Sequence, residues 1–269
     1  MSEVAPEHGH IDLEKPNAAR VYDYYLGGDH NFAIDRQMAE EAIDMWPDLP
    51  LVMQANRAFL RRAVQFCVDR GIRQFLDLGS GIPTVGNVHE VAQLAAPGSR
   101  VVYVDTDPVA VAYSKKLLSD NPEAAIVDAD LRDPERVLGS PEVAELLDLS
   151  QPVALMMVAV LHFVPDADEP YEVVNRYREA LAPGSFLVIS HASNEGRPDV
   201  APAHADLYRK RTTTPLTMRS QAEVTRFFDG LELVDPGVVF LPEWRPVAPT
   251  EVGEHPERLT GLAGVGRKP

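Results

Sequence analysis

The most constraining feature of this sequence is the run Phe75-Leu76-Asp77-Leu78-Gly79-Ser80-Gly81. Its apolar start lacks polar alternation, which is typical of a strand that is covered on both faces of a sheet. The two glycines that follow allow the backbone to turn sharply and to pass close to a ligand. The run therefore predicts a strand, a glycine-rich turn and a helix that together bind a nucleotide-like ligand.

The same rhythm repeats along the middle of the chain. Short apolar runs at residues 75–78, 101–104, 125–127, 153–158 and 186–189 predict parallel strands. Helix signals stand between them: Thr84 before residues 85–96, Asp107 before Pro108, Asp133 before Pro134, and Pro183-Gly184 as a stop. Repeated strand–helix units predict an α/β fold with a doubly wound, mostly parallel sheet and right-handed crossovers.

The two ends of the chain follow other patterns. We expect residues 1–15 to form a flexible tail, residues 16–71 a cap or lid of three helices, and residues 72–269 a Rossmann-like domain. Near the end, Ser220 and Glu223 form a capping box that starts a helix to residue 228, and Gly230 stops it. Strands are predicted at 231–240 and 262–267, the second weakened by its glycines.

Composition restricts the partners. The chain has 41 acidic and 25 basic residues, a net charge of −16, so its field repels phosphate backbones and we expect no nucleic-acid partner. Arg57, Arg61 and Arg62 fit a solvated helix face better than a basic patch. The single cysteine, Cys67, falls in an apolar-periodic stretch and is predicted to be core, so neither a disulfide nor a metal site is expected.

No segment approaches the roughly 20 apolar residues that cross a bilayer. We therefore expect a cytoplasmic protein without a membrane partner.

The turn after the first strand distinguishes between two kinds of ligand. A dinucleotide fingerprint needs a small third residue where Thr84 stands, and Pro83 removes a backbone donor that a pyrophosphate site uses. A ligand without phosphate fits this turn better. An NAD-dependent reductase remains a rival function.

Acidic residues follow the next two strands. Asp105 lies 24 positions after Gly81 (105 minus 81), near the spacing at which a carboxylate meets ribose hydroxyls. Asp107 directly precedes a proline, so it is better explained as a helix cap. After the third strand, Asp130 offers a carboxylate to an adenine amino group, and Leu131 offers an apolar side chain to its ring.

Two histidines follow the fourth and fifth strands. His162 and His191 fall where ligands sit in doubly wound sheets, so both are candidate catalytic bases. The alternative is that packing and backbone hydrogen bonds satisfy these rings in purely structural roles.

Together these residues resemble a known family. The stretches FLDLGSG, VVYVD, VDAD and AVLHFV resemble class I methyltransferases that depend on S-adenosylmethionine (SAM), over residues 72–268. The stretches PNAARVYDYYLGGDHNF and RSQAEVTRFFDGLELVDPGVV resemble one subfamily of them, known simply as S-adenosyl methyltransferase.

The resemblance carries specific implications. SAM would be the cofactor and S-adenosylhomocysteine the product, in a seven-stranded sheet of order 3-2-1-4-5-7-6 with strand seven antiparallel. Its cofactor residues would fall into three groups: Asp77, Gly79, Ser80, Gly81 and Ala159 around methionine, Asp105 at the ribose, and Thr106, Asp130 and Leu131 at adenine. Thr106 departs from the bulky apolar residue often found there, and Val153 from an acidic one. No acidic-Pro-Pro-aromatic tetrapeptide follows strand four, which disfavours adenine or glutamine amide as acceptor.

The N-terminal helices are predicted to select the acceptor. Groups that can hold a ligand are dense there, and the candidate substrate-binding residues are Arg20, Tyr22, Tyr25, His30 and Asn31. Tyr22 and Tyr25 share a helix face and can stack on a substrate ring, or simply pack on the sheet edge. Gly27-Gly28 fits a lid hinge or a helix stop.

The sequence thus predicts a methyltransferase acting on oxygen or nitrogen of a small-molecule substrate. The alternative from another class is a SAM sensor or catalytically silent binding module, because no unmistakable catalytic residue stands out.

Overall fold

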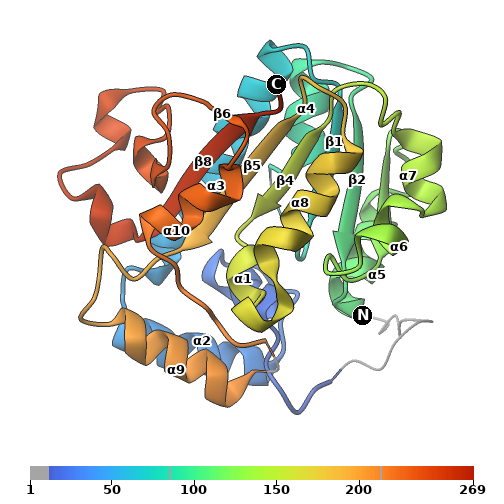
Figure 1. Ribbon diagram of the computed structural model, residues 1–269. Helices are drawn as coiled ribbons and strands as arrows, with labels where there is room; N and C mark the ends of the chain where they lie inside the picture. The colour runs from blue at the N-terminus through green and yellow to red at the C-terminus, as the bar shows by residue number, and fades with distance from the viewer. Residues whose placement is uncertain (1–11, 85, 213) are drawn as a thin grey trace.

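A twisted, mostly parallel sheet forms the centre of the computed structural model, which describes residues 12–84, 86–212 and 214–269 (Figure 1). Its strands run in the order β3-β2-β1-β4-β5-β8-β6, and β7 also pairs with β8. The strands are β1 (Gln74–Leu78), β2 (Arg100–Asp105), β3 (Ala124–Asp128), β4 (Ala154–Val158), β5 (Phe186–Ala192), β6 (Glu232–Leu233), β7 (Val239–Phe240) and β8 (Gly261–Arg267). β8 is antiparallel to β5, which confirms the predicted fold class and the antiparallel last strand.

Helices cover both faces of this sheet. One buried cluster joins the strands to α3 (Leu49–Asp69), α4 (Val88–Ala95) and α5 (Pro108–Leu117). A second joins the other face to α6 (Pro134–Leu138), α7 (Pro141–Leu146), α8 (Pro170–Ala180) and α10 (Gln221–Thr225). Strands buried on both sides explain why the apolar runs lack alternation.

A third cluster lies beyond the carboxyl ends of the strands. It joins α1 (Ala18–Tyr25), α2 (Ala33–Met45) and α9 (Ala201–Arg211), and Figure 1 shows α2 and α9 side by side below the sheet. The sequence analysis overlooked α9. Its buried residues His204, Leu207 and Tyr208 have the three- and four-residue spacing of a helix face, and that spacing is the signal that identifies it.

Several predicted boundaries were wrong. The helix expected from residue 85 begins at Val88, because Asn87 and Glu90 form the capping box in place of Thr84. The strand expected at 231–240 is two short strands, β6 and β7, separated by a turn in which Gly237 has a φ of 93°. The sheet consequently has eight strands where seven were expected.

The glycines of β8 have a packing explanation. A Cβ added at Gly266 would lie 2.8 Å from the Phe228 ring, and one at Gly264 would lie 3.0 Å from Val238 and 3.1 Å from Phe228. Glycine is therefore present because a neighbouring side chain packs directly on the strand backbone.

Other predictions concern the helices before the sheet. Cys67 is fully buried, as expected of a core residue. The solvated arginine face is wrong in part, because Arg62 donates to the carbonyls of Trp244 and Leu241 at 2.9 and 2.7 Å. Residues 1–11 of the expected tail lie outside the described residues, and the division into tail, cap and domain stays a prediction. No helix among the described residues is long and apolar enough to span a membrane.

The Gly27-Gly28 turn is tied to α1. The Asp23 carboxylate accepts hydrogen bonds from the His30 backbone and the Asn31 side chain at 2.9 and 2.8 Å. A Cβ on Gly28 would lie 2.0 Å from that carboxylate, whereas one on Gly27 would meet nothing within 4 Å. These contacts favour a helix stop over a lid hinge.

Substituting Gly28→Ala should therefore lower the free energy of unfolding by about 3 kcal/mol, through overpacking and the loss of the Asp23 hydrogen bonds. Gly27→Ala is the matched control, and its positive φ of 78° should cost only about 1 kcal/mol. Urea denaturation measures both. Equal losses would mean that Asp23 does not fix the turn.

Candidate active site

A cavity of about 500 Å³ opens at the carboxyl ends of β1, β2 and β4, where ligands bind in doubly wound sheets. The residues predicted to hold the cofactor all line it: Asp77, Gly79, Ser80, Gly81, Asp105, Thr106, Asp130, Leu131 and Ala159. Two of the predicted substrate residues, Tyr22 and Tyr25, and both candidate bases also line it. The fold thus gathers segments more than a hundred positions apart around one space.

The glycine turn after β1 has the conformation that the sequence predicted. Gly79 and Gly81 have φ values of 70° and 67°, in the left-handed region that favours glycine. A Cβ on Gly79 would lie 2.1 Å from the Val160 side chain, whereas Gly81 has open space beside it. Gly79 therefore allows the two loops to touch, and Gly81 leaves room for a ligand.

Asp105 organises this turn. One carboxylate oxygen accepts the Gly81 N–H at 2.7 Å, and the other accepts those of Thr106 and Asp107 at 2.8 and 2.9 Å. Burial raises the pKa of Asp105, and these three backbone donors oppose the rise. The oxygen that binds Gly81 retains a lone pair for a ligand hydroxyl, whereas both lone pairs of the other oxygen are engaged. Asp107 caps α5 through the N–H groups of Val109 and Ala110, as expected.

Asp77 is a buried carboxylate at the end of β1. Burial raises its pKa to about 7, the positive charge of Arg57 opposes the rise, and Asp105 adds to it. Its side chain lines the cavity. A cationic ligand group would satisfy it.

Arg57 is a site residue that the sequence analysis missed. It projects from α3 into the cavity wall and donates to the Gly86 carbonyl at 2.8 Å. The sequence placed it on a solvated helix face because nothing in the local spacing distinguishes it from Arg61. Its place beside Asp77 becomes visible only when α3 packs across the strand ends.

Asp130 lies at the edge of the cavity, with its carboxylate already engaged. Arg132 donates to both of its oxygens at 2.6 to 3.0 Å and also pairs with Asp168 at 2.7 Å. Partial burial raises the pKa of Asp130, but the hydrogen bonds from Arg132 outweigh it and lower the value overall. Arg132 thus competes with an adenine amino group for this carboxylate.

The hydrogen bonds of His162 do not fit the expected base. Its Nδ1 accepts the Ala192 N–H at 3.2 Å, so the proton of the neutral ring resides on Nε2. Burial, with the neighbouring charges of His191 and Arg219, holds the pKa of His162 well below its usual range. The ring lines the cavity, and Nδ1 is the nitrogen that binds the backbone. The ring is therefore a donor toward the cavity.

His191 has no free nitrogen for proton transfer. Its Nδ1 donates to the Ala192 carbonyl at 2.8 Å, and its Nε2 accepts from Arg219 at 2.9 Å. Burial lowers its pKa to about 3. Arg219 is itself buried and also binds the carbonyls of Leu161 and Val164. The expectation that His191 acts as a base is therefore not supported, and its contacts fit the structural alternative.

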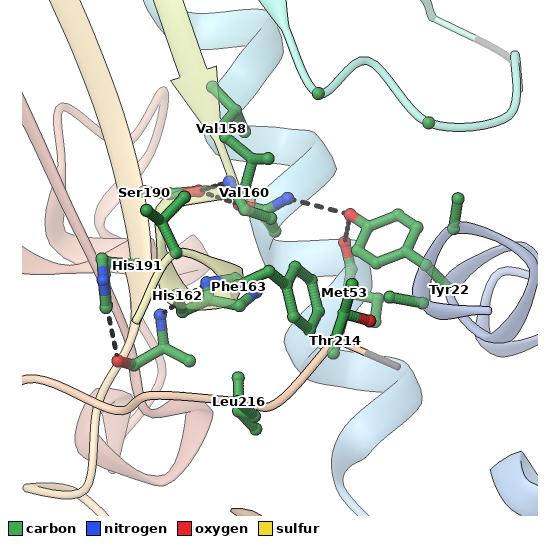
Figure 2. A pocket seen from close by; sticks show the side chains of 18 of the residues that line it. Tyr22, Met53, Val158, Val160, His162, Phe163, Ser190, His191, Thr214 and Leu216 are labelled. Carbon is green, nitrogen blue, oxygen red and sulfur yellow. Dashed lines mark hydrogen bonds between the residues drawn. The ribbon is translucent and has the colours of Figure 1, made fainter. Parts of the chain in front are cut away.

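A hydrogen-bonded chain connects the strand ends to the N-terminal helix. Ala159 N–H donates to Ser190 Oγ at 2.9 Å, the Ser190 hydroxyl donates to Asn56 Oδ1 at 2.5 Å, and Asn56 Nδ2 donates to Tyr22 Oη at 2.8 Å. Figure 2 shows Ser190 and Tyr22 of this chain, with His162 and Phe163 nearby. It holds Ala159 at a positive φ of 58°. Ser190 and Asn56 were missed, because isolated polar residues within apolar segments carry no motif.

Three of the predicted substrate residues do not line the cavity. Arg20 pairs with buried Asp35 at 3.3 Å, Asn31 donates to Asp23, and His30 packs on the Tyr113 ring at 3.9 Å between centroids. These contacts join α1 to α2, and the segment between these two helices to α5. The substrate role expected for Arg20, His30 and Asn31 is therefore not supported, because their side chains contact other side chains outside the cavity.

Comparisons with known proteins now identify the family. The family model described as S-adenosyl methyltransferase matches residues 4–269. The chain belongs to this family. It is a SAM-dependent methyltransferase, and the rival NAD-dependent reductase is excluded.

Solved structures agree with this assignment. A DUF574-family protein from Streptomyces avermitilis is 43% identical, over 97% of this chain and 100% of its own, with a TM-score of 0.93. A protein from Thermobifida fusca, named as a candidate methyltransferase, is 42% identical over 99% of both chains, with a TM-score of 0.92. Human N-acetylserotonin methyltransferase in complex with SAM is 16% identical over 95% of this chain and 63% of its own, at a TM-score of 0.50, a likeness of fold alone. No curated protein matches.

The residues of this methyltransferase fit SAM. The buried Asp77 carboxylate suits an ammonium group, and Asp105 retains acceptor capacity for a hydroxyl. The open space beside Gly81 leaves room for the ligand to lie against the turn.

Proposed function

We propose that this methyltransferase transfers the methyl group of SAM to an oxygen or nitrogen atom of a small-molecule acceptor. The observation that carries this proposal is the continuity of the cavity. From the cofactor residues it extends past Ala159 and His162 to side chains of α1 and α9, including Tyr25 and Tyr208. An acceptor therefore has to reach the methyl group through a space lined by these helices.

We assign the cofactor contacts from the positions described above. Asp77 would hold the methionine ammonium, Arg57 its carboxylate, and Asp105 a hydroxyl of the ribose. Leu131 and Thr106 would contact the adenine ring at the cavity edge. The amino group of adenine would have to share Asp130 with Arg132.

The protein's contribution to the reaction is orientation. SAM supplies an electrophilic methyl group on a sulfonium that leaves as a neutral thioether. Neither His162 nor His191 offers a free lone pair to accept a proton, so the acceptor attacks with its own lone pair and loses its proton to water once the methyl group is bound. Holding the two reactants in line supplies much of the rate in such a displacement.

His162 then has a specific expected phenotype. His162→Phe, which removes the Nε2–H donor, should lower kcat/KM by roughly tenfold, as for one lost hydrogen bond. His162→Gln keeps a donor and should lose less. A general base would instead contribute about 10²- to 10⁴-fold. A loss of that size with a pH profile flattened in both variants would restore the base role.

The proposed acceptor class can be tested with methyl-labelled SAM. The protein is incubated with label and a cell extract that has been separated into low-molecular-weight, protein and nucleic-acid fractions. Label should enter a product only with the low-molecular-weight fraction, while SAM is converted to S-adenosylhomocysteine. Transfer to protein or nucleic acid would contradict the proposal. Binding of SAM without any transfer would favour the sensor that the sequence left open.

A further inference from the structure

Aromatic rings form a continuous wall along the acceptor side of the cavity. Each ring contacts the next, with centroids 4.4 to 5.9 Å apart. In order they are Trp46, His204, Tyr208, Phe163, His162 and His191, and all six line the cavity. We call this set the ring strip. It is assembled from four separate segments, the loop after α2, helix α9, the turn after β4 and the strand β5.

The side chains that line the space beside the ring strip are uncharged. Arg219, which binds His191, and Arg197, which lies over Trp46, contact the strip but do not line the cavity. Figure 2 shows Tyr22, Met53 and Leu216 around Phe163. The charged side chains among the described lining residues are Arg57, Asp77, Asp105, Asp130, Arg132 and Asp168. All of them lie at the cofactor end of the cavity, on α3, at the strand ends or on segments that follow them. A charged acceptor would therefore lose its hydration without gaining a counter-charge.

The histidines of the ring strip do not change this conclusion. Burial lowers the pKa of His204 to about 4, and every influence on His162 also lowers its pKa. Protonating His162 would place a second N–H against the Ala192 N–H that its Nδ1 now accepts. The ring strip therefore remains neutral near pH 7. It offers aromatic surface with several N–H donors, because Trp46 Nε1 and the His204 ring nitrogens have no partner among the described residues and His162 adds its Nε2–H.

We propose that the acceptor is an uncharged aromatic molecule that packs against the ring strip and accepts a hydrogen bond from His162. Offset and edge-to-face contacts between rings give such a molecule an advantage beyond the area it buries. An aliphatic molecule of equal size lacks those contacts, and an anion lacks a partner. This inference rests on the proposed small-molecule function, because it names the class of acceptor for the same cavity.

The test uses three probes of matched size on the full chain saturated with S-adenosylhomocysteine. They are 2-naphthol, its carboxylate analogue 2-naphthoate, and the saturated decahydro-2-naphthol. At pH 7, calorimetry should show 2-naphthol binding roughly tenfold more tightly than 2-naphthoate, and several-fold more tightly than the saturated alcohol. Equal or tighter binding of either competitor, or no binding of 2-naphthol up to its solubility, would overturn the proposal.

Variants locate the probe. Tyr208→Leu and Phe163→Leu each remove one ring of the strip. Each variant should lower the affinity for 2-naphthol about fivefold. Tyr113→Leu is the matched control, because Tyr113 lies on the surface outside the cavity and should leave the affinity unchanged. Unchanged affinity in both strip variants would refute the assigned position.

The affinity for S-adenosylhomocysteine is measured first in every variant. If the unaltered protein does not bind it, the proposed function fails. If it binds while the probe preference is absent, only the acceptor class fails. A strip variant that misfolds is recognised by its lost cofactor affinity, and the other strip variant then decides.

Discussion

Substituting Asp105→Ala should reduce the affinity for SAM by at least a hundredfold. We assign the remaining lone pair of this carboxylate to a ribose hydroxyl, and a hydrogen bond to a charged group is worth about 1.5–3 kcal/mol. The same carboxylate also accepts three backbone N–H groups, including that of Gly81 at 2.7 Å. The substitution therefore removes a ligand contact and releases the glycine turn. Isothermal titration with SAM measures the loss.

The neighbouring carboxylate provides the control. Asp107 is also acidic and buried, but its side chain caps α5 through Val109 and Ala110. Asparagine is an equally good cap, so Asp107→Asn should leave the SAM affinity within about twofold. An undiminished SAM affinity in Asp105→Ala would contradict the ribose assignment of Asp105. A large loss of affinity in Asp107→Asn would point to Asp107 as the residue that binds the ribose.

These residues show what the sequence could predict. Asp77, Gly79, Gly81 and Asp105 follow their strands directly, and the carboxyl ends of parallel strands meet at one edge of a sheet. Their place in the cavity therefore follows from the strand pattern alone. The glycines of β8 were harder, because their neighbour Phe228 lies outside the strand and local propensity cannot reveal it.

The acceptor side of the cavity depends on tertiary packing. The sequence suggested that Arg20, His30 and Asn31 bind a ligand. In the structure they contact Asp35, Tyr113 and Asp23, respectively. Polar residues in a short helix-turn-helix serve caps and buried ion pairs as readily as ligands, and spacing does not separate these uses. The two histidines illustrate the same limit, because their roles depend on hydrogen bonds from Ala192 and Arg219.

The affinity for SAM should fall as the pH is lowered through the pKa of Asp77. Burial raises this pKa to about 7 in the free protein, whereas binding the methionine ammonium requires the ionised carboxylate. At about pH 6 only roughly a tenth of the free protein has ionised Asp77, so the affinity should be roughly eightfold lower than at about pH 7.5. Measurements stay below about pH 7.5 because an α-amino group loses its proton near pH 7.7–8.0.

Asp77→Asn removes the titrating group. Its affinity should be at least tenfold lower near pH 7.5, since one charge-assisted hydrogen bond is worth about 1.5–3 kcal/mol. The dependence on pH between about 6 and 7.5 should nearly disappear. A variant that keeps the slope of the unaltered protein would show that another group titrates.

Arg57 separates the charge effect from direct contact. Its positive charge lowers the pKa of Asp77, so Arg57→Ala should move the midpoint of the affinity profile above about pH 7. Arg57→Lys keeps the charge but loses the planar fork that pairs with a carboxylate. Arg57→Lys should therefore leave the midpoint unchanged while lowering the affinity for SAM at every pH. A midpoint that stays fixed in Arg57→Ala would mean that Arg57 does not lower the pKa of Asp77. Full SAM affinity in Arg57→Lys would show that Arg57 does not bind the carboxylate of methionine.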